Sequence, residues 1–75
     1  MTPSNAAQTA SEVRHRRAMA VLRDVIRSGG TDNWSHLKSH GHSFSTVWSC
    51  VRQGWLAADG RYRYALTETG HGKAA

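Results

Sequence analysis

Residues 43–70, SFSTVWSCVRQGWLAADGRYRYALTETG, decide the fold of this chain. In the first part of the stretch, apolar residues recur at the i, i+3, i+4, i+7 spacing of an amphipathic helix. After Gly54 the pattern changes to that of two short strands around Asp59-Gly60, a residue pair that favours a tight type I′ turn. The stretch therefore predicts a helix followed by a β-hairpin.

The predicted helix at 43–53 has two contrasting faces. Ser43 can cap its first turn, because a serine hydroxyl accepts a hydrogen bond from a backbone N–H of that turn. The inward face would consist of four apolar residues, Phe44, Val47, Trp48 and Val51. Cys50 and Arg52 would lie at the flanks. The opposite face carries short, uncharged polar side chains, namely Ser45, Thr46, Ser49 and Gln53.

This outward polar face is a candidate for contact with DNA bases. A face without acidic groups can enter the major groove, where Gln pairs with adenine and Ser or Thr bonds to several base edges. The alternative is an ordinary solvated helix face with small residues. Because the face has little charge of its own, binding to DNA would need cationic side chains elsewhere.

A long first helix is predicted upstream. It would begin with the capping box TASE at 9–12 and continue to Ser28. Gly29-Gly30 would end it, since glycine adopts the left-handed conformation common just after a helix. Its inward face would consist of Ala18, Met19, Val21, Leu22, Val25 and Ile26.

A short second helix is predicted between the other two. It would start with Thr31 or Asp32 as its N-cap, run to about His40 and place Trp34 and Leu37 inward. Gly41 would stop it. Two short helices joined by a tight glycine-containing turn form the layout of a helix-turn-helix.

The strands after Gly54 predict a hairpin with one aromatic and one basic face. On the second strand Tyr62, Tyr64 and Leu66 would point one way and Arg61, Arg63 and Ala65 the other, because side chains alternate along a strand. The arginine fork suits phosphate oxygens and a narrow minor groove, so Arg61 and Arg63 are candidates for DNA contact. The alternative is that they only solubilise an edge strand.

The ends of the chain carry weaker signals. Residues 1–8 are small and polar without period, so a flexible tail is expected there. Residues 9–70 would form the domain. Gly70 and Gly72 weaken any helix after Thr67, so residues 71–75 are expected to fray.

Parts of this stretch resemble prokaryotic winged helix-turn-helix regulators of the MarR and PadR-like type. The matching segments are STV at 45–47, VRQGWL at 51–56 and YALTETG at 64–70. In that group the first lies in the recognition helix, the second opens the wing and the third closes it. Over roughly residues 10–72 the resemblance implies an α+β fold of three helices followed by a two-stranded hairpin wing.

The charge of the chain favours a polyanionic partner. Ten Lys and Arg residues stand against five Asp and Glu residues, a formal net charge of +5, which attracts nucleic acid. Solubility, or binding to acidic proteins or ribosomal RNA, would explain the same charge. Besides Arg61 and Arg63, the candidates for contact with the DNA backbone are Arg52, Lys38, Ser35, Asn33, Arg14, Arg16 and Arg17.

Catalytic and metal chemistry find little support in the sequence. His36 and His40 have the i, i+4 spacing of a chelating pair and His42 follows, but Cys50 is the single cysteine and no zinc motif exists. We therefore expect no enzyme, no metal and no cofactor. The tryptophans are expected in the core, while Tyr62 is left open as a base-stacking residue. No membrane segment is apparent, and a cytoplasmic location is expected.

The predicted function is binding of double-stranded DNA, as a sequence-specific transcriptional regulator. The recognition helix at 43–53 would enter the major groove and the wing at 55–66 would contact the backbone or the minor groove. Two alternatives stay open: a winged-helix module that binds protein, as an inhibitor or assembly factor, and an architectural or recombination-accessory DNA binder. A homodimer also stays open.

Overall fold

The computed structural model describes residues 5–75, with side chains described from Ala10 onward. The elements of this part follow in the order α1 (Asn5–Arg27), β1 (Thr31–Asn33), α2 (Trp34–Ser39), α3 (Phe44–Arg52), β2 (Leu56–Ala58), β3 (Arg63–Leu66) and α4 (Glu68–Ala74). The three strands form one antiparallel sheet in the order β1-β3-β2. The predicted α+β class is confirmed, but β1 and α4 were not expected.

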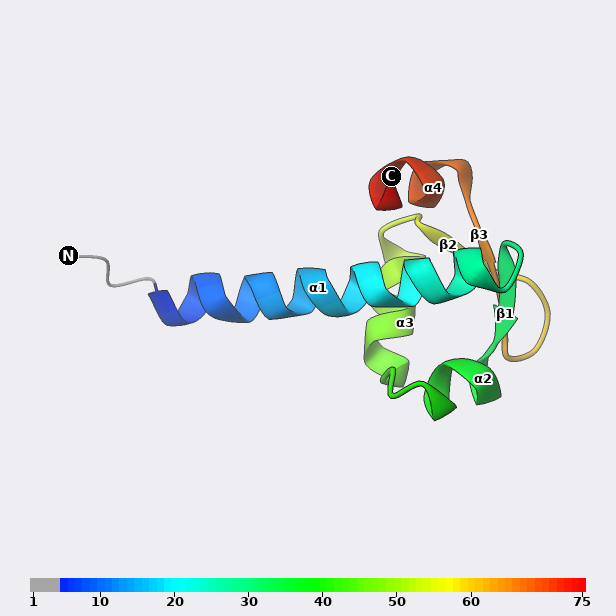
Figure 1. Cartoon of the computed structure of the whole chain (residues 1–75), viewed down its shortest axis with the longest axis horizontal. Coiled ribbons are helices and arrows are strands. Elements are labelled where there is room, and N and C mark those ends of the chain that lie inside the picture. The colour runs from blue at the N-terminus through cyan, green and yellow to red at the C-terminus, as the bar shows by residue number, and fades with distance from the viewer. Residues whose placement is uncertain (1–4) are drawn as a thin grey trace.

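Helix α1 is longer than predicted and only its second half belongs to the body of the molecule. It begins at Asn5, so the helix start predicted at residues 9–12 is wrong, and residues 5–8 of the predicted tail are helical. Residues 1–4 lie outside the described part. Figure 1 shows the N-terminal half of α1 projecting from the other elements, which accounts for the elongated dimensions of 47 × 24 × 19 Å.

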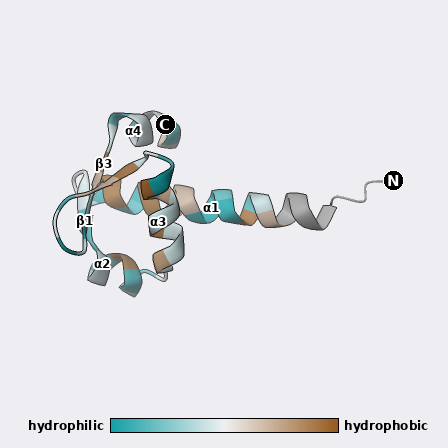
Figure 2. Cartoon of the chain, turned by 180° about the vertical axis from the view of Figure 1, so that it is seen from behind, coloured by the Kyte–Doolittle hydropathy of each residue, from teal (hydrophilic) through white to brown (hydrophobic). Residues whose placement is uncertain are grey.

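The core forms where α1 crosses α3 and the sheet. Figure 2 shows hydrophobic segments gathered in this body, whereas the coloured part of α1 that extends beyond it is mostly hydrophilic. The buried apolar side chains of the described residues are Ala18, Met19, Val21, Leu22, Val25, Leu37, Val47, Cys50, Leu56 and Tyr64. Ile26, predicted to face inward, is 40% exposed, because it lies at the edge of the apolar face beside Gly29 and Leu66. Within the described residues, no helix combines the length and apolar character needed to span a bilayer.

Helix α3 buries only part of the predicted face: Val47 is buried and Val51 packs against the core as expected, but Phe44 and Trp48 do not follow. Ser43 caps it as expected, accepting from the backbone N–H of Thr46. Val47 and Cys50 are fully buried, whereas Phe44 and Trp48 remain 44% and 38% exposed. The buried face is centred nearer Cys50 because α1 packs on that side, where the thiol lies 3.9 Å from the Ala18 carbonyl oxygen. The prediction that Phe44 and Trp48 are core residues is therefore wrong.

The segment before α2 forms a strand instead of a helix start. Thr31–Asn33 pairs with β3, and Asn33 is the N-cap of α2, accepting from the His36 N–H at 2.9 Å. The predicted N-caps, Thr31 and Asp32, are therefore wrong. The Asp32 carboxylate is buried and accepts from the Ser28 hydroxyl, the Asn33 N–H and the His36 ring.

The β2–β3 hairpin has a longer connection than Asp59-Gly60 alone. Ala58 pairs with Tyr64, and the Asp59 N–H donates to the Arg63 carbonyl oxygen at 2.9 Å. A two-residue turn at Asp59-Gly60 would instead pair Ala58 with Arg61 and change which side chains share a face. The observed register pairs Leu56 with Leu66, so burial of apolar side chains outweighs the local turn preference.

Helix α4 closes the body, and the expected fraying at 71–75 is wrong for residues 71–74. Thr67 caps it, accepting from the Gly70 N–H at 2.9 Å and donating to the Gly54 carbonyl oxygen at 2.5 Å. Gly70 packs directly on the backbone of Trp55, and the Lys73 ammonium lies 5.4 Å from the centre of the Trp55 ring. These tertiary contacts offset the low helix propensity of the glycines.

Candidate nucleic-acid interface

A groove runs between the projecting half of α1 and helix α3. We call it the α1–α3 groove. Two adjoining hollows form it, with Arg14, Ala18 and Ser49 common to both. Its other lining residues are Ser11, His15, Ser45, Thr46, Arg52, Gln53 and Trp55. A third hollow, beside the N-terminus of α3, adds Arg17, His42 and Ser43. The lining of these three hollows contains arginines, hydroxyls and imidazoles but no carboxylate. A further hollow, which adjoins them at Ser11 and His15, is lined by Glu12 and Arg16.

Helical spacing explains why Arg14 and Arg17 face this groove. Arg14 precedes the buried Ala18 by one helical turn, and Arg17 precedes the buried Val21 in the same way. Both therefore continue the core-facing side of α1 past the edge of the body. Both side chains are exposed, so their guanidinium groups are free to approach an anion.

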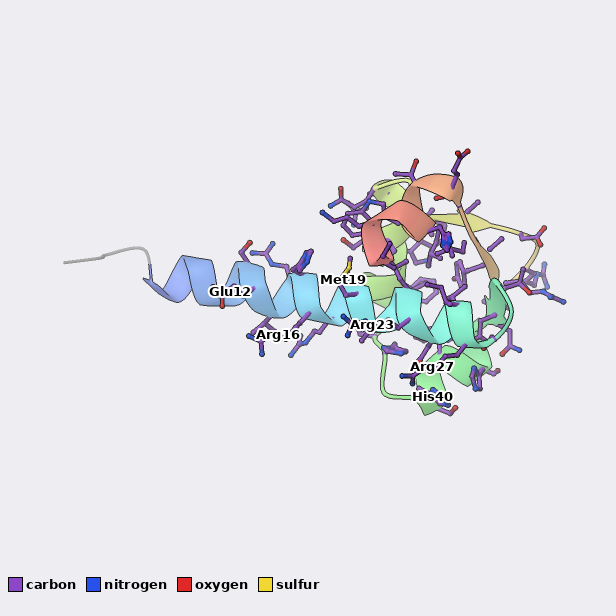
Figure 3. The ribbon with its side chains drawn as sticks, turned by 45° about the horizontal axis from the view of Figure 1, so that its top comes forward. Glu12, Arg16, Met19, Arg23, Arg27 and His40 are labelled. Carbon is purple, nitrogen blue, oxygen red and sulfur yellow. The ribbon has the colours of Figure 1, made fainter. Side chains whose placement is uncertain are left out.

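Arg16, Arg23 and Arg27 occupy the other side of α1. Figure 3 shows them in sequence along the helix, with Glu12 before the first and His40, which directly follows α2, near the last. Arg16 lies 3.9 Å from the Glu12 carboxylate and Arg27 lies 3.8 Å from that of Asp24. The structure thus separates Arg16 from Arg14 and Arg17, with which it was grouped by sequence.

The exposed side of α3 consists of two parallel rows at i, i+4, i+8 spacing. One row is Ser45, Ser49 and Gln53, and it borders the α1–α3 groove. The other row is Phe44, Trp48 and Arg52. Three of the predicted base contacts thus form the first row.

Thr46, the fourth predicted base contact, is half-buried at the groove. Its hydroxyl lies 2.8 Å from that of Ser43, so the helix cap already engages it. Ser45 and Gln53 are exposed, and Ser49 is half-buried. All four predicted base contacts line the groove, and none is fully covered.

The remaining predicted phosphate contacts lie elsewhere. Arg63 is exposed at the start of β3, opposite Asn33 of β1, and Arg61 lies in the hairpin connection instead of on a strand. The predicted alternation of Arg61 with Tyr62 along a strand is therefore wrong. Ser35 and Lys38 are exposed on α2, and the Asn33 side chain is engaged as its cap. None of these five residues lines the α1–α3 groove.

A row of aromatic rings lies on the side of α3 away from the groove. Trp34 packs edge-on against Phe44 at 5.0 Å, Phe44 against Trp48 at 5.9 Å, and Trp48 against Tyr64 at 6.4 Å between ring centres. Tyr64 is buried, whereas Phe44 and Trp48 are substantially exposed. Sequence reasoning missed this surface because apolar spacing alone does not tell which part of a helix stripe the body covers.

Tyr62 sits at the hairpin connection with φ of 61°, a left-handed conformation that is uncommon for a residue with a side chain. Its carbonyl oxygen accepts from the Trp34 N–H at 2.7 Å, which ties the connection to the start of α2. Its ring is 60% exposed. This hydrogen bond thus fixes the backbone of Tyr62 while its ring remains exposed to solvent.

Histidines and carboxylates link α1 to the turn that follows α2, and β1 to α2 itself. Asp24 accepts from the His42 ring at 2.5 Å and from the His40 ring at 3.1 Å. The hydrogen bond from His42, assisted by that from His40, lowers the pKa of Asp24 despite the opposing effect of burial. His36 bonds to Asp32 at 2.6 Å, and its ring centre lies 4.1 Å from that of His40.

These contacts explain the histidine pattern seen in the sequence. The Nδ1 atoms of His36 and His40 both face carboxylates. Among the described residues, no group of three or more His, Cys, Asp and Glu side chains is arranged to hold a metal ion. His40 and His42 thus connect the turn after α2 to Asp24 of α1, and His36 connects α2 to Asp32 of β1.

Cys50 is fully buried, and burial raises the pKa of its thiol to about 11. A thiol with so little thiolate at neutral pH is a poor nucleophile. The structure gives it the role of a small core residue.

Comparison of the chain with protein-family models, curated proteins and solved structures finds no match.

Proposed function

We propose that this chain is a winged helix-turn-helix domain that binds double-stranded DNA, with α3 as the recognition helix. The observation that carries the proposal is the α1–α3 groove. It places Arg14 and Arg52 beside the hydroxyl and amide groups of α3, with Arg17 at one end and no carboxylate in its lining. Arginine binds phosphate oxygens bidentately, and hydroxyl and amide groups bond to base edges.

The order of elements supports the fold assignment. A helix, a strand, two helices joined by a tight turn and then a hairpin follow one another, and the first strand pairs with the last. The turn between α2 and α3 contains Gly41 in a left-handed conformation. In this arrangement the β2–β3 hairpin is the wing, and Arg61 and Arg63 are its cationic side chains.

Each element has a role in the proposed complex. Helix α3 enters the major groove with Ser45, Ser49 and Gln53 toward base edges. The sugar-phosphate backbone at the edge of that groove lies between α3 and the projecting half of α1, where Arg14 and Arg17 neutralise phosphates. The role is that of a sequence-specific regulator, because α3 offers base-reading groups beside the cationic ones.

Selection from a random pool of duplex DNA tests this proposal. We expect binding at low salt and enrichment of related sequences, with an affinity for selected over random duplex higher by about a thousandfold or more. Absence of binding to any duplex by folded protein would contradict DNA binding. Binding with no preference would instead favour the architectural role.

The exposed aromatic rings favour a second candidate, a protein-binding module. Phe44, Trp48 and Tyr62 expose 44%, 38% and 60% of their surface, and exposed aromatic groups often anchor protein interfaces. This candidate predicts that Arg14→Gln and Arg17→Gln leave the activity intact while Trp48→Gln removes it. The DNA proposal predicts that the arginine variants lose binding.

A further inference from the structure

Among the residues that the structure describes, no element covers the outer edge of the row Phe44, Trp48 and Arg52 on α3. Phe44 and Trp48 expose 44% and 38% of their surface, and Arg52 is exposed one turn further on. Edge-on packing against Trp34 and Tyr64 fixes the two rings, so they form a firm apolar ridge. The ridge lies directly beside the polar row of Ser45, Ser49 and Gln53.

The charges around this ridge favour a polyanionic occupant. Helix α3 itself carries no acidic residue, and its only charged side chain is Arg52. Across the α1–α3 groove lie Arg14 and Arg17. The ridge is thus apolar, has a cationic end and has no anionic neighbour on its helix. It is complementary to a surface that is apolar locally and anionic at its edge.

The major groove of DNA is apolar locally and anionic at its edge where it contains thymine. Each thymine presents a C5-methyl group on the groove floor, and each strand lines the groove with phosphates. The methyl is the apolar group by which side chains recognise thymine there, as phenylalanine and other apolar side chains do. Cytosine lacks it and presents an amino donor in the same groove.

We propose that Phe44 and Trp48 contact thymine methyl groups and so determine a preference for thymine in the bound site. The inference rests on the proposed function and deepens it. Ser45, Ser49 and Gln53 bond to base edges while the aromatic row packs on neighbouring methyls. The bound sequence therefore contains thymine at the positions that face this row.

The test compares two forms of one duplex that differ only in the C5-methyl group. A duplex selected from the random pool is synthesised with thymine and with uracil at each position in turn, and binding is measured by fluorescence anisotropy. We expect uracil to weaken binding about fourfold at each contacted position, the effect of losing one buried methyl group. This comparison needs only the unaltered protein.

Variants assign the preference to the two rings. Phe44→Gln and Trp48→Gln should each bring the thymine-to-uracil affinity ratio at their contacted positions close to one. Ile26→Gln is the matched control, because Ile26 is similarly exposed, at 40%, but lies on α1 beside Gly29 and Leu66. It should keep the wild-type ratio.

The possible outcomes distinguish a failure of the thymine preference from a failure of DNA binding itself. If the unaltered protein binds neither form, the proposed function fails and the inference with it. If it binds both forms equally, the inference is wrong and DNA binding stands. If Phe44→Gln and Trp48→Gln keep the ratio but abolish association with a second copy in sedimentation, the ridge is a protein surface and the inference is overturned.

Discussion

At the scale of the residue, the contacts of Thr67 and Gly70 explain the sequence LTETG at 66–70. Thr67 donates to Gly54, accepts from Gly70 and uses its own N–H to bond to the Trp55 carbonyl oxygen at 3.1 Å. Gly70 sits so close that a Cβ built on it would lie 2.0 Å from that same oxygen. A hydroxyl and a glycine three residues apart are therefore needed to dock α4 on the end of α3.

Gly70→Ala should destabilise the fold by about 2 kcal/mol or more, because the added methyl meets backbone that cannot move aside. Gly72→Ala is the control, since a Cβ there meets nothing within 4 Å and alanine favours helix. Urea unfolding followed by circular dichroism measures both. Equal stability of Gly70→Ala and the wild type would contradict the close packing of α4.

Cys50 should resist thiol reagents in the folded protein. Its side chain is fully buried and its pKa is raised to about 11. Near neutral pH a reagent therefore cannot reach the sulfur, and very little of the thiol is ionised. We expect labelling by an aromatic disulfide reagent to follow the unfolded fraction as urea is added. Rapid labelling without denaturant would show that the core around Cys50 is open.

At the scale of the element, the features predicted correctly from the sequence depend on neighbouring residues. The features that the sequence did not predict depend on pairing between residues far apart in the chain. The caps at Ser43 and the stop at Gly29-Gly30 involve neighbouring residues, and both were predictable. Strand β1 exists because it pairs with β3, and its three residues carry no alternation of their own. The hairpin register follows from burying Leu56 with Leu66, which overrides the preference of Asp59-Gly60.

The candidate site was predictable in the same partial way. Helical periodicity gave the polar row of Ser45, Ser49 and Gln53. It did not give the neighbouring row with Phe44 and Trp48, because a spacing pattern does not show how far the body covers an apolar stripe. Arg14, Arg16 and Arg17 were grouped by their nearness in sequence, although the same periodicity places Arg14, but not Arg16, one turn before the buried Ala18.

The link between α1 and the turn after α2 should depend on pH through Asp24. Hydrogen bonds from His42 and His40 hold its pKa below the ordinary value, so its stabilisation is present above about pH 4 and lost as the pH falls through the lowered pKa. Asp24→Asn should cost about 1–3 kcal/mol near neutral pH. The difference in stability between this variant and the wild type should shrink in acid, because protonation leaves the Asp24 side chain uncharged, as asparagine is.

The control for that experiment is Glu12→Gln. The Glu12 carboxylate is 69% exposed and lies 3.9 Å from Arg16, so its removal should change the free energy of unfolding by less than about 0.5 kcal/mol. Thermal or urea unfolding measured over a series of pH values provides both comparisons. An Asp24→Asn effect that stays constant down to strongly acidic pH would contradict the role given to this carboxylate.

At the scale of the whole molecule, the distribution of charge matters more than its sum. Five carboxylates offset ten cationic side chains, and none of the five lines the α1–α3 groove. Glu12 and Asp24 have ion-pair partners, Asp32 is buried against His36, Asp59 lies at the hairpin and Glu68 lies in the first turn of α4. Arg14, Arg17 and Arg52 therefore line the groove with no carboxylate among them.

The salt dependence of duplex binding measures this distribution most directly. Each neutralised phosphate steepens the plot of log affinity against log salt by about 0.9. Arg14→Gln/Arg17→Gln should therefore reduce the slope by about two, whereas Arg23→Gln/Arg27→Gln, with the same change in net charge, should leave it unaltered. Equal slopes for the two double variants, or no duplex binding by the unaltered protein, would contradict DNA binding at the α1–α3 groove.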